Sequence, residues 1–166
     1  MLHYADLFKR DYTTGTEGYT LAVALFLSKD EVIRNILPHY KTDAILRKLD
    51  LDRYDDREII TTNLIEAYDK LMAFVAKHLP DKFHLEGDER VNLRGLIFME
   101  VVANLLVHRE FINEFPSKFI IQNDGVYSEN WNRPHGSGLL ILEHLSPYPK
   151  NPIIAGSFEK LEELMN

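Results

Sequence analysis

The segment from Asn92 to Arg109 is the strongest constraint on the fold, because it is apolar on nearly every side of a helix. A helix that is apolar all round is typical of a buried helix. Glu100, Asn104 and His108 interrupt this pattern, and their spacing of four residues places them on one stripe of the helix. Burying a carboxylate without a partner is costly. We therefore expect the stripe to face an ionic partner, a metal or a water-filled pocket.

Two interpretations of this stripe stay open at the level of the sequence. In the first, Glu100 forms an ion pair with Arg94, with Arg109 or with a partner on another element. In the second, Glu100 handles a proton and Asn104 holds a metal or a polar ligand. His108 and Arg109 end the helix, where the macrodipole favours cations, so a capping role for them requires no ligand.

The elements around this helix predict an α+β fold, with helices packed on one face of a small, mostly antiparallel or mixed sheet. Residues 1–18 read as polar and irregular. Helices are expected over 17–27 with Thr16 as the cap, over 30–37, over 58–79 with Asp55 or Asp56 as the cap, over 92–108 and over 152–165. Strands are expected over 43–49, 83–85 and 118–122, the last followed by a tight turn at 123–125 into 126–128.

Composition narrows the function classes. A chain of 166 residues reads as one domain spanning 1–166. The absence of cysteine excludes disulfides, thiolate zinc sites and a cysteine nucleophile, and it fits a cytoplasmic protein. The net charge of −7, from 19 basic and 26 acidic residues, disfavours direct binding to DNA. The longest apolar-rich stretch, Leu96–Val107, is too short to span a membrane, and no secretory signal is visible.

Several segments in order along the chain resemble the RecG-related transcriptional regulators, a family related to ATP-dependent DNA helicases. They are Thr20–Asp30, Asp56–Ile60, Asn63–Glu66, Glu100–Glu110, Phe119–Gly125, Glu129–Pro134 and Pro149–Ala155, and they span most of the region from residue 20 to residue 155. The C-terminal domain of that family is similar to the ATP-binding fold of the GHKL superfamily, which includes gyrase, the histidine kinases and MutL.

The resemblance implies a nucleotide-binding module that takes ATP and Mg²⁺. Glu100 is then the candidate catalytic base and Asn104 the candidate magnesium ligand. Glu100, Asn104, His108, Arg109, Asp124 and Gly125 are together the candidate nucleotide-binding residues. The resemblance further implies that the chain is a piece of a larger multidomain regulator, that DNA is contacted only through domains outside this chain, and that a homodimer is an open possibility.

The sequence also departs from the superfamily pattern, which leaves an alternative function open. Tyr127 stands where the adenine-reading motif has its second glycine, and no glycine-containing phosphate segment follows Ala155. These departures favour a scaffold that serves dimerisation or regulation, with at most weak ATPase activity.

Three other features have both a functional and a structural interpretation. Gly136–Gly138 could contact phosphate, although the segment lacks the lysine and spacing of a P-loop. His108, His135 and His144 could bind a metal, although their spacing matches no ligand signature. Trp131 could stack on a base or anchor its loop by packing.

Overall fold

A four-stranded mixed sheet forms the centre of the computed structural model, which describes residues 7–133 and 149–165. Its strands are β3 (Thr42–Arg47), β4 (Asp56–Ile60), β7 (Ser117–Gln122) and β8 (Val126–Glu129), in the spatial order β4-β3-β7-β8. β3 pairs antiparallel with β4 and parallel with β7, and β7 pairs antiparallel with β8. Each strand of the central parallel pair carries three consecutive buried apolar residues, 44–46 in β3 and 119–121 in β7, as is typical of strands covered on both faces.

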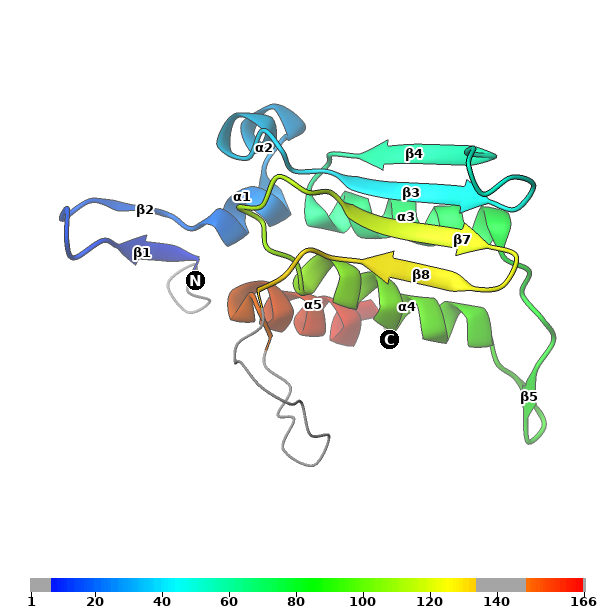
Figure 1. Ribbon diagram of the computed structural model, residues 1–166. Coiled ribbons are helices and arrows are strands. Elements are labelled where there is room, and N and C mark those ends of the chain that lie inside the picture. Colours follow the sequence, from blue (N-terminus) through cyan, green and yellow to red (C-terminus); the bar gives the residue numbers. More distant parts are fainter. Residues whose placement is uncertain (1–6, 134–148, 166) are drawn as a thin grey trace, which may run out of the picture.

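Two long helices cover one face of this sheet, and a third lies against the second (Figure 1). They are α3 (Leu64–His78), α4 (Leu93–Val107) and α5 (Pro152–Met165). Leu71 of α3, Leu106 of α4 and Phe119 of β7 are fully buried in the core between the helices and the sheet. The expected α+β fold, with helices on one face of a mixed sheet, is therefore confirmed. None of the helices in the described ranges is long and apolar enough to cross a membrane.

The N-terminal region differs from the expected irregular segment and helix. β1 (Phe8–Arg10) and β2 (Glu17–Tyr19) form a hairpin, followed by α1 (Leu21–Leu27) and α2 (Asp30–Ile36). The expected helix start at Glu17 is wrong because Glu17 pairs with Arg10. Thr16 does not cap the helix, since its hydroxyl contacts that of Thr14 within the hairpin turn.

The start of α3 also lies further along the chain than expected. Residues 58–60 belong to β4, where Ile60 is fully buried opposite Thr42. The helix begins after Asn63, whose side chain accepts a hydrogen bond from the Glu66 N–H at 3.0 Å. Asp55 and Asp56 therefore do not cap this helix.

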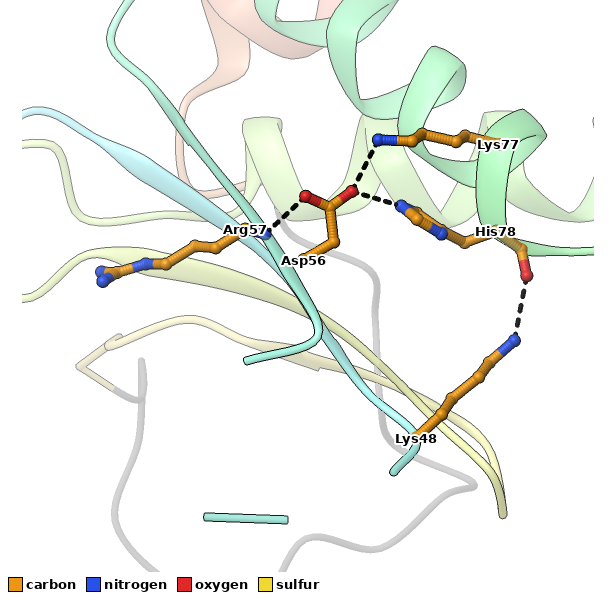
Figure 2. Close-up of polar contacts among 5 residues, drawn as sticks. All are labelled: Lys48, Asp56, Arg57, Lys77 and His78. Atoms are coloured by element: carbon orange, nitrogen blue, oxygen red, sulfur yellow. Dashed lines mark hydrogen bonds and ion pairs between the residues drawn. The ribbon is translucent and has the colours of Figure 1, made fainter. Parts of the chain in front are cut away.

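Asp56 instead contacts the opposite end of α3 (Figure 2). Its Oδ2 accepts from Lys77 Nζ at 2.8 Å and contacts His78 Nε2 at 2.7 Å. Lys48, which follows β3, donates to the carbonyl oxygen of His78 at 3.0 Å. These contacts fix the C-terminal end of α3 to the β3–β4 edge of the sheet.

α4 is buried only along its C-terminal half, so the expectation of a wholly buried helix is wrong. Val102, Leu105 and Leu106 are buried, whereas Leu96 is 58% exposed and Ile97 is 49% exposed. In the second half, all residues from Val102 to Val107 except Asn104 are buried, whereas none in the first half is. A small hairpin of β5 (Leu85–Glu86) and β6 (Glu89–Arg90) precedes α4.

Candidate functional site

A cavity of about 340 Å³ lies between α4 and the N-terminal part of α5. Glu100 and Asn104 both line it, as expected of a shared concavity. Their side chains are solvent-exposed, even though the same helix carries core residues on its other sides. The complete lining among the described residues is Glu100, Ala103, Asn104, Val107, His108, Pro149, Ala155, Phe158 and Glu159. The polar stripe therefore faces open space rather than the core.

Glu100 and Asn104 contact each other directly across one helical turn. The Asn104 side-chain amide donates to Glu100 Oε1 at 2.5 Å. Among the side chains that the structure describes, those of residues 7–133 and 149–160, Glu100 has no ion-pair partner and none donates to the Asn104 amide oxygen. The contact orients the Asn104 amide with its nitrogen toward the carboxylate, which leaves its oxygen available to a ligand.

The arginines that could have paired with Glu100 are engaged elsewhere. Arg94 Nη1 donates to the carbonyl oxygens of Leu79, at 2.7 Å, and Ala76, at 3.4 Å, and so satisfies the C-terminal end of α3. Arg109 points into the core and donates to Lys41 O and Thr42 Oγ1, both at 3.3 Å. The ion-pair interpretation of Glu100 therefore does not hold with either arginine.

Arg109 does not line the cavity, although it belongs to the predicted nucleotide-binding set. Its side chain is 2% exposed, and its guanidinium lies 4.8 Å from the Tyr40 ring centre and 5.1 Å from that of Phe111. Burial lowers the pKa of Arg109 and raises the pKa of Tyr40 to about 12. This arginine holds the end of α4 against the start of β3 by stacking and hydrogen bonds.

Asp124 and Gly125 lie apart from the cavity, in the turn between β7 and β8. The Tyr127 hydroxyl donates to Asp124 Oδ2 at 2.8 Å, and this hydrogen bond raises the pKa of Tyr127. A Cβ at Gly125 would lie 3.7 Å from the Tyr127 hydroxyl, so the tyrosine folds back over the turn. The predicted residues thus separate into a cavity group of Glu100, Asn104 and His108, a core arginine and a distant turn.

Asparagine side chains close the C-terminal end of α4, beside His108. Asn130 donates to the Leu105 carbonyl oxygen at 2.8 Å. Asn151 donates to the carbonyl oxygens of Val107, at 2.8 Å, and Arg109, at 2.9 Å. The last carbonyl groups of a helix have no partner within the helix, so these amides satisfy them. The contacts hold both the segment after β8 and the start of α5 at the mouth of the cavity.

No spacing pattern in the sequence predicts these asparagine contacts, because they join segments far apart along the chain. Two signals in the sequence point to these residues: Asn130, Asn132 and Asn151 lie in polar segments that contain prolines, and those segments are among the ones that carry the family resemblance. The amide of Asn132 also points to this helix end, at a longer 3.5 Å from the His108 carbonyl oxygen.

The remaining candidates are only partly described. Gly136–Gly138, His135 and His144 lie outside the described residues. Trp131 is exposed, its ring centre lies 5.8 Å from the Arg133 guanidinium, and it lines a pocket together with Glu110 and Asn113. Across the described ranges, no three His, Asp or Glu side chains group closely enough to hold a metal by themselves.

Comparisons of this chain with protein-family models, with curated proteins and with solved structures gave no match.

Proposed function

We propose that this chain is a nucleotide-binding module of the ATP and Mg²⁺ type, with the GHKL fold, from a RecG-like transcriptional regulator. The observation that carries the proposal is the Glu100–Asn104 pair on the wall of the cavity between α4 and α5. Because the pair faces open space and no arginine neutralises Glu100 in the described chain, its chemistry is available to a ligand. The cavity volume is within the range of small-molecule sites.

The residues present fit a magnesium–phosphate ligand better than a magnesium ion alone. Mg²⁺ bound to nucleotides keeps several waters and takes only one or two protein oxygens beside the phosphates. The Asn104 amide oxygen would be such a ligand. A bound Mg²⁺ would supply charge neutralisation to the phosphate oxygens. The lack of a grouped set of carboxylates and histidines in the described ranges is compatible with this arrangement.

Glu100 is the candidate base in this proposal. A carboxylate one turn from the metal ligand can accept the proton of a water positioned for attack on phosphate. Its hydrogen bond from Asn104 orients it toward the cavity. We expect turnover to be slow at best, because Tyr127 stands where the adenine-reading motif of the superfamily has its second glycine.

A second candidate function is a scaffold that has kept the fold without nucleotide turnover. The specific observation in its favour is Tyr127, which folds over the Asp124–Gly125 turn and hydrogen-bonds its carboxylate. A carboxylate occupied in this way is less free to read an adenine. In both functions, DNA contact belongs to other domains, since the net charge of −7 opposes binding to a phosphate backbone.

The unfolding temperature of the whole chain, measured with ATP, ADP and GTP, each with and without Mg²⁺, distinguishes the two functions. A nucleotide-binding module is stabilised by ATP, and Mg²⁺ increases that shift. No shift at millimolar ATP contradicts the nucleotide proposal and supports the scaffold.

Variants then test the assigned roles. Asn104→Ala should remove the Mg²⁺-dependent part of the shift, because it deletes the oxygen ligand and leaves a good helix former. Asn35→Ala, at an exposed position of α2, is the matched control. Glu100→Gln should preserve binding and lower any turnover about 10²- to 10⁴-fold, whereas Glu31→Gln should not. Brisk hydrolysis unaffected by Glu100→Gln would place the site elsewhere.

A further inference from the structure

The open side of α4 continues into an apolar groove that the proposed function does not use. This groove, called here the α4 groove, has a volume of about 550 Å³. It is lined by Leu79, Pro80, Lys82, Phe83, His84, Leu93, Arg94, Ile97, Phe98 and Val126. It is separate from the Glu100–Asn104 cavity, and the two share no lining residue among those described.

Large apolar side chains gather around the α4 groove. Among the residues that line it, Phe83 is 70% exposed, Ile97 is 49% exposed and Leu93 is also exposed. Single exposed apolar residues are ordinary on a protein surface, but a contiguous group of this kind marks an interaction site. The position of the group on a helix that is otherwise part of the core adds to this interpretation.

The β5–β6 hairpin beside the groove extends away from the body of the molecule (Figure 1). Residues 82–90 are all exposed, and each strand has only two residues. An isolated two-stranded hairpin is at best marginally stable in water. This hairpin therefore gains stability if it packs against another surface.

The charges of the α4 groove and of the hairpin indicate which surface the hairpin binds. The ionisable groups that line the α4 groove are Lys82, His84 and Arg94, with no carboxylate among its described lining residues. The hairpin tip carries Glu86, Asp88 and Glu89, while Arg90 is paired with Asp81 at 3.2 Å. The groove and the hairpin are therefore complementary in charge, and both are present on every copy of the chain.

We propose that the α4 groove binds the β5–β6 hairpin of a second copy, and that the two copies exchange hairpins across a two-fold axis. A two-fold interface uses the same surface on both subunits, which a groove and an adjacent complementary arm provide. Leu85 of the arm supplies apolar contact to the partner's groove, which Phe83 lines, and the carboxylates at the tip of the arm face the basic side chains of that groove.

Sedimentation equilibrium of the whole chain across about 1–100 µM tests this surface. The chain should form a dimer, and Ile97→Glu should weaken the dimer at least about tenfold because it buries two charges in the paired interface. Leu49→Glu, at a position 92% exposed in the β3–β4 loop, should leave the dimer unchanged. A chain that stays monomeric at the highest concentration, or a dimer indifferent to Ile97→Glu, overturns the proposal.

A charge exchange distinguishes hairpin swapping from any other pairing of the same face. The groove variant Lys82→Glu with His84→Glu, and the hairpin variant Glu86→Lys with Glu89→Lys, should each dimerise at least about tenfold more weakly alone. An equimolar mixture should recover dimers, because each hairpin then meets a groove of opposite charge. A mixture that stays monomeric contradicts hairpin exchange. None of these measurements depends on nucleotide, so the outcome is independent of the proposed function.

Discussion

α3 and α4 lie on the same face of the same sheet, and each has 15 residues, yet they bury their side chains differently. α3 is amphipathic, and its buried residues follow one face along its whole length. They are Leu64, Ala67, Tyr68, Leu71, Phe74 and Val75. α4 is apolar on more sides, but its buried residues are confined to 102–107.

The difference teaches how to interpret an all-round apolar helix. One face of α3 is enough to meet the core, and its other face is polar. The apolar residues of α4 exceed what the sheet, α3 and α5 cover, so part of the pattern specifies surfaces outside the core. Glu100 and Asn104 line one such surface, and Leu93 and Ile97 line another.

Truncation of one residue on each helix tests this contrast most strongly. Leu71→Ala should lower the free energy of unfolding by about 2–5 kcal/mol, because Leu71 is fully buried. Ile97→Ala should cost about 1 kcal/mol or less in the monomer, since half of its surface is already exposed. Urea unfolding at low protein concentration measures both. Equal losses would mean that α4 is covered within a single chain.

The ends of the two helices give the second comparison. Both C-terminal ends are satisfied by distant segments, that of α3 by the cationic side chains of Lys48 and Arg94 and that of α4 by neutral asparagine amides. Asn151→Ala should lower the free energy of unfolding by about 1–3 kcal/mol, because it leaves two carbonyl groups without a donor.

Asn132→Ala is the matched control for that change. It removes one contact at 3.5 Å, so urea unfolding should show a change within about 0.5 kcal/mol. If Asn151→Ala is as mild as the control, the amide contacts do not hold the end of α4.

Loss of the Asp56 contacts should have the smallest effect on the free energy of unfolding, and that effect should depend on pH. Hydrogen bonds from Lys77 and His78 lower the pKa of Asp56 below its ordinary value of 3.8. Because the folded-state pKa is the lower one, the contribution of Asp56 to stability is present above about pH 4. It is lost as the pH falls through the folded-state pKa.

Asp56→Asn should therefore destabilise the protein at pH 7 and flatten the loss of stability between pH 5 and pH 2.5. Urea midpoints measured across that range provide the test. Asp69→Asn, at an exposed position of α3, should keep the pH dependence of the parent chain. An unchanged pH dependence in Asp56→Asn would show that the contacts in Figure 2 contribute nothing.

Local pattern was sufficient to predict most of the fold. Apolar residues at steps of three and four, from Leu64 through Leu71 to Val75, predict a helix with one core face, and the turn at 123–125 predicts the β7–β8 pairing; the structure confirms both. The expected cap at Asp55 or Asp56 wrongly placed the start of this helix at Glu58, whereas the cap is Asn63. Ile60 belongs to β4 through its pairing with Thr42, a contact that no local pattern contains.

The candidate site was predictable only where it lies on one helix. Glu100, Asn104 and His108 line one cavity because a helix brings residues four apart to one side. Arg109 follows immediately in sequence but turns inward, since the Tyr40 and Phe111 rings enclose its guanidinium. The position of these two rings depends on tertiary packing, and so does the part of the cavity wall that α5 supplies.

The parallel pairing of β3 with β7 has a consequence for the order in which the protein is made. β4 follows β3 closely in sequence and can pair with it early in synthesis. The other edge of β3 has no hydrogen-bonding partner until β7, which begins at Ser117, has been synthesised. During synthesis, a buried apolar strand therefore presents an open edge while α3 and α4 are still being translated. Such edges recruit other chains. We expect the nascent protein to depend on chaperones over this interval and to complete its sheet late.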